Sequence, residues 1–319
     1  MKKCLCCMQD YSEQEGACPF CGYSESQMEK DRQSMPEALP MGTILGNRFL
    51  IGRVMSLTGY AILYLSWDML LHRRLVLREY FPTTLANRAE EDLTLCCPDE
   101  ESRKKFEEGK AVFLLEGKIL SENQDLPEIC NIYRCIEENG TAYQVMEYMQ
   151  IETLQERLEH INTAETEIAQ DLFLKLCDAL EVVQKRGIVH GNLNPDNIGF
   201  DEFRFIRFFG FGVAEREMTL LTKGEIRTDR PAYTAPEYDK EQPLTSAADM
   251  YSLGAIYYRL LSGKEFTPSL SEDDELGLEN TEPSRISLLK ALLRQDPGER
   301  IQDVEQITLL FGEQTVAVP

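Results

Sequence analysis

The chain has 319 residues, of which 43% are hydrophobic and 28% are charged, a composition typical of a folded protein and not of a disordered one. Its 55 acidic and 33 basic residues leave a formal net charge of −22. This argues against general binding to nucleic acids or to anionic membranes, because both need a basic surface. No apolar run approaches the roughly 18 residues of a membrane span. The first residues form no apolar signal core, so we expect a cytoplasmic protein.

Half of the ten cysteines lie within the first 21 residues. Two Cys-x2-Cys pairs are separated there by ten residues, and each such turn can present two thiolates to a tetrahedral zinc ion. Reduced surface thiols are the alternative, but this short segment has almost no other core material. The sequence therefore predicts a structural zinc ribbon over residues 1–23, with no open coordination position and no chemistry of its own. Its expected ligands are Cys4, Cys7, Cys18 and Cys21.

Residues 24–44 are polar, contain two prolines and lack apolar periodicity, which indicates a linker. The following segments are short, rich in β-branched, aromatic and leucine residues, and divided by turn residues such as Asn139-Gly140. They predict strands over residues 48–56, 60–67, 74–81, 129–137 and 142–146, with a helix over 102–121 between them.

Beyond Ile151 the apolar residues recur at helical spacing. A helix over 167–186 is predicted to stop at Gly187, a residue that favours helix C-termini. Further helices are predicted over 247–262, 285–294 and 301–311. The layout is a small sheet-rich lobe followed by a larger helical lobe.

Seven short motifs then follow one another in a fixed order. They are Arg78-Glu79-Tyr80-Phe81-Pro82 after a strand, Glu116 within a helix, Met146-Glu147-Tyr148, His190-Gly191-Asn192-Leu193-Asn194-Pro195-Asp196-Asn197, Gly210-Phe211-Gly212, Ala235-Pro236-Glu237 and Asp249-Met250-Tyr251-Ser252-Leu253-Gly254. Their order and spacing resemble the protein kinase family, most closely bacterial serine/threonine kinases with a zinc ribbon in front. The resemblance implies an α+β, bilobal kinase-like fold over residues 45–312, a tail over 313–319, and ATP with Mg²⁺ as cofactors.

The residues that would bind nucleotide in this family are altered here. The phosphate-binding loop corresponds to Ser56-Leu57-Thr58-Gly59-Tyr60-Ala61, where the side chains of Ser56, Thr58 and Ala61 would obstruct the approach of phosphates and only Gly59 is a glycine. The phosphate-pairing lysine corresponds to Arg78, which can still form an ion pair with Glu116. We interpret that pair as structural, with contact to phosphate as the less favoured alternative. In the adenine pocket Leu63 and Val76 add volume, although shifts of the sheet could reopen it, and Glu147 lies at the hinge.

The residues that would perform the chemistry are also replaced. The resemblance puts the catalytic base at Asn192 and a metal-binding aspartate at Gly210, and an amide cannot serve as a base near neutral pH. Only Asn197 remains of the Mg²⁺ set, and one neutral amide cannot hold a hard dication that prefers carboxylates. Rescue by Asp196 is given little weight, because that position serves the scaffold in the family. We therefore expect no catalytic residue and no productive ATP/Mg²⁺ binding.

The resemblance also implies scaffold residues, and these are retained. Leu120, His190 and Phe211 match a hydrophobic column of the family. Glu237 and Arg300 match a buried ion pair of the helical lobe, and Asp249 matches the helix aspartate that accepts hydrogen bonds from the catalytic loop. Loss of chemistry with retention of scaffold favours a pseudokinase that acts as an interaction or regulatory module. A weak or atypical kinase, with a metal site built from Glu116 or Asp201, and a metal-independent ATP sensor are the alternatives.

The expected partners are proteins, among them kinases, phosphatases or forkhead-associated domains, and not nucleic acids or membranes. The acidic stretch between Ser271 and Pro283 is a solvated loop or, less favoured, a docking surface. The threonine of the tail, Thr315, is followed three residues later by a valine, as in ligands of forkhead-associated domains, although a frayed tail is the simpler interpretation.

Overall fold

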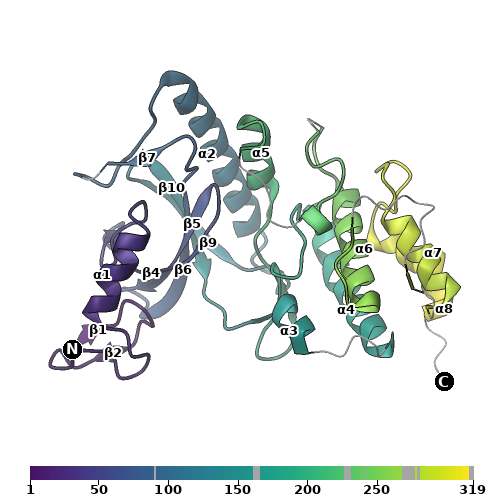
Figure 1. Ribbon diagram of the computed structural model, residues 1–319, viewed down its shortest axis with the longest axis horizontal. Coiled ribbons are helices and arrows are strands. Elements are labelled where there is room, and N and C mark those ends of the chain that lie inside the picture. The colour runs from purple at the N-terminus through teal and green to yellow at the C-terminus, as the bar shows by residue number, and fades with distance from the viewer. Residues whose placement is uncertain are drawn as a thin grey trace. The chain divides into compact units, whose positions relative to one another are not determined.

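The chain folds as two units, each with its own sheet (Figure 1). Unit 1 comprises residues 1–124, 131–149 and 221–226, and unit 2 comprises 125–130, 150–220 and 227–319. The computed structural model describes residues 1–89, 91–160, 166–225, 231–240, 242–267, 277–278 and 281–315.

Unit 1 is built on a six-stranded antiparallel sheet, which confirms the predicted β-rich lobe. The turn between its last two strands needs left-handed backbone, and Asn139 and Gly140 supply it with φ of 53° and 70°. The strands lie in the order β3 (Ile44–Leu45), β4 (Phe49–Leu57), β5 (Ala61–Asp68), β6 (Arg73–Tyr80), β10 (Thr141–Glu147) and β9 (Ile132–Glu138).

Helix α2 (Glu100–Ser121) packs on this sheet where a helix was predicted. Asp99 caps its first turn, because a carboxylate oxygen accepts the backbone N–H of Ser102 at 2.7 Å. A Cβ at Gly117 would lie 2.6 Å from Cys135 Sγ on β9, so only glycine allows the helix to approach the sheet this closely. A small hairpin, β7 (Asn87–Arg88) with β8 (Leu95–Cys96), precedes the helix.

The segment predicted as a linker, residues 24–44, is not irregular: it contains helix α1 (Glu25–Ser34). A capping box formed by Ser24 and Gln27 begins the helix, so caps define it where an apolar stripe does not. None of its residues is buried, which explains why the sequence shows no helical periodicity there. Before it, β1 (Lys2–Lys3) pairs with β2 (Asp10–Tyr11).

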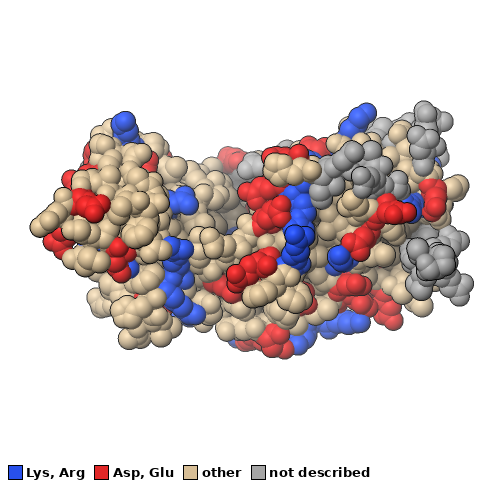
Figure 2. Space-filling view, turned by 90° about the horizontal axis from the view of Figure 1, so that it is seen from below, with Lys and Arg blue, Asp and Glu red and all other residues tan. Residues whose placement is uncertain are grey.

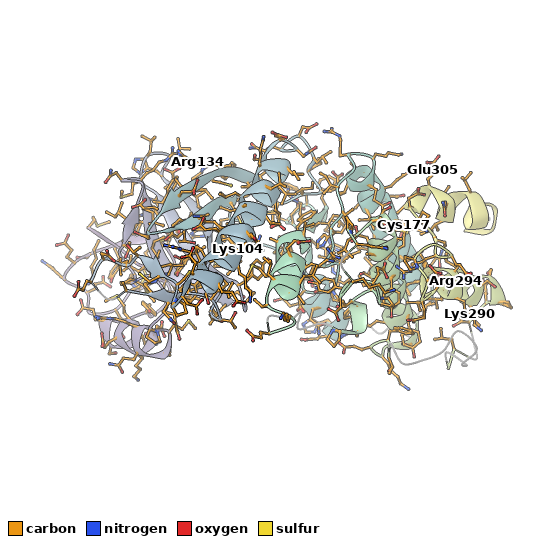
Figure 3. The ribbon with its side chains drawn as sticks, turned by 90° about the horizontal axis from the view of Figure 1, so that it is seen from above. Lys104, Arg134, Cys177, Lys290, Arg294 and Glu305 are labelled. Carbon is orange, nitrogen blue, oxygen red and sulfur yellow. The ribbon has the colours of Figure 1, made fainter. Side chains whose placement is uncertain are left out.

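Unit 2 is mainly helical, as predicted, and carries a three-stranded sheet. Helix α6 (Ser246–Ser262) is buried along nearly its whole length. Tyr257 on this helix stacks on Phe173 of helix α4 (Thr166–Gln184), with ring centroids 3.9 Å apart. Cys177, labelled in Figure 3, lies on the same helix as Phe173 and is also buried.

The strands of unit 2 are β11 (Glu152–Thr153), β12 (Ile198–Phe200) and β13 (Ile206–Phe208). Two helices were not predicted, α3 (Leu154–His160) and α5 (Val213–Leu221), the second of which ends at the boundary with unit 1. The predicted helices are α4 (Thr166–Gln184), α6 (Ser246–Ser262), α7 (Pro283–Leu292) and α8 (Val304–Thr315), and a 3-10 turn at Pro231–Tyr233 lies between α5 and α6.

No helix in the described ranges is both long enough and apolar enough to cross a membrane. On the face drawn in Figure 2, basic side chains stand beside acidic ones and form no broad basic surface among the described residues. Most of the acidic stretch between Ser271 and Pro283, and the tail beyond Thr315, lie outside the described residues.

Candidate functional site

The four predicted zinc ligands come together at the N-terminus of the chain. Their sulfur atoms all lie within 4.8 Å of one another, with 3.6 Å between Cys4 Sγ and Cys21 Sγ and 3.7 Å between Cys7 Sγ and Cys18 Sγ. A tetrahedral zinc ion with Zn–S bonds of about 2.3 Å places its sulfur ligands about 3.8 Å apart. These residues therefore fit a four-thiolate metal site that leaves no position open for a substrate.

Each Cys-x2-Cys pair forms the same turn. Met8 N donates to Cys4 O at 2.8 Å, and Gly22 N donates to Cys18 O at 2.7 Å. The residue after each second cysteine has left-handed backbone, with φ of 58° at Met8 and 74° at Gly22. Two matching turns facing each other are the local fold that converts the sequence spacing into a tetrahedral set of sulfurs.

In unit 1, the arginine at the lysine position forms the predicted ion pair. Arg78 Nη1 lies 2.6 Å from Glu116 Oε1, and both side chains are buried. The same nitrogen donates to Gln144 Oε1 at 3.2 Å. Gln144 is held in turn, because its Nε2 donates to the backbone carbonyl of Phe113 at 2.8 Å. The buried guanidinium of Arg78 is therefore held in one position by Glu116 and Gln144.

The loop at the phosphate-binding position turns its aromatic residue onto the same guanidinium. Tyr60 is 2% exposed, Arg78 Nη2 donates to its hydroxyl, and the guanidinium carbon lies 5.1 Å from the centre of its ring. Backbone bonds hold the loop there, from Thr58 N to Ala61 O at 2.9 Å and from Phe81 N to Tyr60 O at 2.7 Å. The sequence does not predict this role for Tyr60, since it depends on how the loop folds back over the sheet.

The predicted pocket residues of unit 1 share one face of the sheet with Arg78. Leu63 pairs with Arg78 across β5 and β6, and Val76 lies two residues earlier on β6, so the side chains point the same way. Val76 is buried and Leu63 is half-buried. Glu147 lies at the end of β10 and accepts a hydrogen bond from Asn131 Nδ2 at 3.0 Å.

In unit 2, the catalytic-loop segment is held by the predicted aspartate. The backbone nitrogens of His190 and Gly191 each donate to the Asp249 carboxylate at 2.8 Å. His190 stacks on Phe211 with ring centroids 4.4 Å apart. Complete burial lowers the pKa of His190 to about 3, so the ring is neutral and packs as a core residue. Leu120, the third predicted member of the column, is buried within unit 1.

The amide at the position of the catalytic base is tied to its neighbours. Asn192 Nδ2 donates to Glu215 Oε2 at 3.0 Å, and Asn192 Oδ1 accepts from Asn194 Nδ2 at 3.0 Å. Asn194 is buried and also bonds the backbone carbonyl of Asn192 at 3.0 Å. These contacts use both ends of the Asn192 amide within unit 2. Asn194 and Glu215 were not predicted as part of this set.

The retained asparagine fills the space beside the glycine at the metal-binding position. Asn197 Nδ2 donates to Asn192 O at 2.9 Å and to Gly210 O at 3.4 Å. Gly210 has a φ of +67°, and a Cβ added there would lie 2.5 Å from Asn197 Oδ1. A Cβ at Gly212 would lie 2.4 Å from Asn192 Cβ. As this part of unit 2 is folded, a side chain at position 210 requires the side chain of Asn197 to shift.

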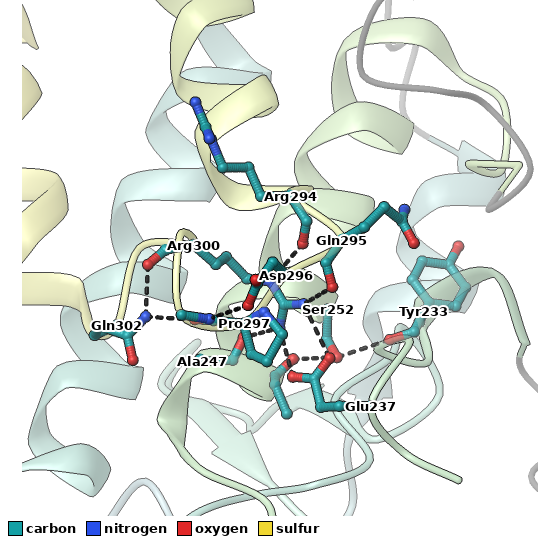
Figure 4. A network of polar contacts seen from close by, with 12 residues as sticks. Tyr233, Glu237, Ala247, Ser252, Arg294, Gln295, Asp296, Pro297, Arg300 and Gln302 are labelled. Carbon is teal, nitrogen blue, oxygen red and sulfur yellow. Dashed lines mark hydrogen bonds and ion pairs between the residues drawn. The ribbon is translucent and has the colours of Figure 1, made fainter. Parts of the chain in front are cut away.

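The predicted buried ion pair of unit 2 is present and is extensively bonded (Figure 4). Arg300 binds Glu237 with both terminal nitrogens, at 2.6 and 2.9 Å, and its Nη1 also donates to Ala247 O at 2.7 Å. The Arg300 side chain is 0% exposed. This two-pronged geometry is what a guanidinium and a carboxylate favour, so the pair joins the segment around Glu237 to α6.

A second buried arginine, which the sequence does not single out, secures the helix that follows the Gly210-Phe211-Gly212 motif. Arg216 on α5 donates through Nε to Tyr238 O at 3.0 Å and through Nη2 to the carbonyls of Lys240 and Gln242. Three backbone acceptors on one cation hold α5 to residues Tyr238, Lys240 and Gln242.

Comparison with known proteins agrees with this arrangement. A family model described as "Protein kinase domain" matches residues 96–309. A solved structure titled "PpkA-294 apo form" superposes with a TM-score of 0.69 and 26% sequence identity, covering 86% of this chain and 99% of the other.

Curated relatives point the same way. A "Probable serine/threonine-protein kinase" of Clostridium acetobutylicum is 28% identical over 226 residues, covering 70% of this chain and 31% of that protein. The serine/threonine-protein kinase PknD of Chlamydia caviae is 25% identical over 301 residues, covering 82% of this chain and 30% of that protein. The chain thus spans about a third of the length of these relatives. On its fold, its retained motifs and the family match, the chain belongs to the protein kinase domain family.

Proposed function

We propose that this kinase-fold chain is a pseudokinase, an interaction or regulatory module with a structural zinc ribbon and without efficient phosphotransfer. The observation that carries the proposal is that the chain's own side chains use the groups that ATP and Mg²⁺ would need. Tyr60 and Glu116 engage Arg78 in unit 1, and Asn197 fills the space beside Gly210 in unit 2.

For phosphate, the relevant group is the guanidinium of Arg78. A phosphate would compete with Tyr60 for Nη2 and with Glu116 for Nη1, and a buried carboxylate that loses its partner is costly. The loop offers little in exchange, because its backbone nitrogens at Thr58 and Ala61 are already bonded within the turn. These contacts support a lobe that is stable without nucleotide.

For the chemical step, the residues present cannot replace those that are missing. Phosphoryl transfer needs metal-held phosphates and a group that accepts or orients the attacking hydroxyl. The amide of Asn192 accepts no proton near neutral pH, and loss of a general base alone costs about 10²–10⁴ in rate. Asn197 is a neutral ligand turned onto backbone carbonyls, whereas Mg²⁺ prefers carboxylates.

A binding role is supported by what has been kept. The pairs Arg300–Glu237 and Asp249 with the His190 backbone maintain the scaffold of unit 2 although no chemistry depends on them. We propose protein partners, such as kinases, phosphatases or forkhead-associated domains, because the net charge of −22 disfavours nucleic acids and anionic membranes.

A phosphotransfer assay tests this proposal. The purified chain of 319 residues, incubated with γ-labelled ATP and Mg²⁺ or Mn²⁺, should label neither itself nor a generic protein substrate above background. Background is defined by the Asn197→Ala variant purified in parallel, which lacks the one metal-binding residue that the motif retains. Labelling by the wild-type chain that this variant does not show would refute the proposal.

A further inference from the structure

The turn of residues 4–7, here called the knuckle, is hydrogen-bonded directly to a strand of the six-stranded sheet. The backbone N–H of Arg53 on β4 donates to Leu5 O at 2.8 Å, and Arg53 Nε donates to Cys6 O at 3.1 Å. Leu5 and Cys6 are the two residues between the ligands Cys4 and Cys7. The carbonyls that receive these hydrogen bonds therefore belong to the turn that the metal would close.

The neighbouring residue on β4 shows how closely the knuckle approaches. A Cβ at Gly52 would lie 2.2 Å from Met8 Cε, 2.4 Å from Leu5 O and 2.8 Å from Leu65 O. Gly52 does not have left-handed backbone, so the requirement for glycine comes from space alone. Met8, which follows the ligand Cys7, is 2% exposed at this contact.

Further contacts bind the same N-terminal region to strand β5. Lys3 Nζ lies 3.6 Å from the centre of the Trp67 ring, and Leu39 N donates to the Tyr64 hydroxyl at 2.9 Å. Tyr64 in turn donates to the buried Glu79 carboxylate at 2.7 Å. The ribbon and the segment after α1 are thus packed on strands β4 and β5 of the sheet (Figure 1).

These contacts connect metal binding to the folding of β4. A ribbon of about 25 residues cannot bury a core alone, so metal binding would supply the energy that orders it. Leu5 belongs to the turn that the metal would close and Met8 directly follows it, and both also pack on Gly52 of β4. The conformation of these two residues therefore affects both the ribbon and the strand. Strand β4 runs directly into the loop of residues 58–60, which carries Tyr60 and leads into β5.

We propose that the metal site is a brace for the nucleotide-loop strand: occupancy of the four cysteines fixes β4, and loss of the metal loosens β4 and the loop that holds Tyr60 on Arg78. The ribbon then works as a metal-responsive part of the kinase lobe and not as a separate appended module. This inference does not depend on whether the chain transfers phosphate.

Amide hydrogen exchange on the chain of 319 residues tests the coupling. Removal of zinc with a chelator, verified by metal analysis, should raise exchange in the peptides covering 49–57 and 61–68 by about fivefold or more, the usual lower limit of coupling between sites. Exchange in helix α6 (Ser246–Ser262) of unit 2 should stay unchanged. Unchanged exchange over 49–57 in the metal-free chain would overturn the proposal.

Variants test the same coupling from the other side, because linkage between two sites is reciprocal. Gly52→Ala and Met8→Ala should release zinc to a chromophoric chelator at least about fivefold more readily than the wild type does. The matched controls are Gly16→Ala, where an added Cβ meets nothing within 4 Å, and Phe20→Ala, whose side chain is 65% exposed. Because Met8→Ala removes atoms from the contact with Gly52 and adds none, it keeps the test valid where Gly52→Ala does not fold. Zinc retention equal in Met8→Ala and Phe20→Ala would contradict the brace.

Discussion

Replacement of Arg300 by alanine is expected to lower the free energy of unfolding by about 3–5 kcal/mol. The reason is that the Glu237 carboxylate, whose side chain is 12% exposed, would lose both bonds to the guanidinium and remain as an uncompensated charge. The carbonyl of Ala247 would lose its donor as well. Urea unfolding followed by circular dichroism measures the loss.

A second arginine in the same loop provides the control. Arg294 pairs with Glu299 at 2.8 Å, but the two side chains are 43% and 62% exposed. An exposed pair of this kind contributes at most about 1 kcal/mol, so Arg294→Ala should be close to wild type. Its backbone carbonyl, which accepts from Arg300 Nε, is retained in the variant. Equal losses for the two variants would show that burial of the Arg300 pair is not what stabilises unit 2.

Restoration of an aspartate at the metal-binding position is expected to destabilise the protein. In Gly210→Asp, the new Cβ would have to share space with Asn197 Oδ1, which lies 2.5 Å from its ideal position. Overpacking of this kind costs about 1–3 kcal/mol. The residue also keeps a φ of +67°, a left-handed conformation that costs a further 1–3 kcal/mol, roughly, in residues other than glycine. Urea unfolding again gives the difference.

Gly187→Asp separates the two costs. Gly187 has a φ of +70°, close to that of Gly210, but an added Cβ there meets nothing within 4 Å. The backbone cost is therefore shared, and Gly210→Asp should be less stable than Gly187→Asp by the overpacking cost of about 1–3 kcal/mol. Equal stabilities would mean that Asn197 moves aside freely and that the position can still accept a metal-binding carboxylate.

Much of the fold can be predicted because the buried strands and helices have recognisable residue types and apolar spacing in the sequence. The strands of unit 1 are rich in β-branched and aromatic residues, and α4 and α6 bury apolar residues at helical spacing. Helix α1 cannot be predicted from apolar spacing, since none of its residues is buried. The signal that could have found it is the capping box of Ser24 and Gln27, which depends on polar and not on apolar residues.

Some features of the candidate sites can likewise be predicted from the sequence, and others cannot. The spacing of the four cysteines predicts their cluster, and the retained charges of Arg78 and Glu116 predict their ion pair, because each depends on residue types at fixed positions. The burial of Tyr60 against Arg78 and the fit of Asn197 beside Gly210 could not be predicted. Both depend on how loops fold back on a completed core, and local sequence does not determine that packing.

The most direct test of whether the chain's own side chains have taken the place of nucleotide is its melting temperature. This temperature is followed as ATP is raised to millimolar concentration, with and without Mg²⁺. A ligand that binds only the folded state must raise the midpoint, by an amount that grows with its concentration. With Tyr60 bonded to Arg78 and Asn197 filling the space beside Gly210, we predict no shift under either condition. A midpoint that climbs steadily with ATP, and climbs further when Mg²⁺ is added, would contradict the account.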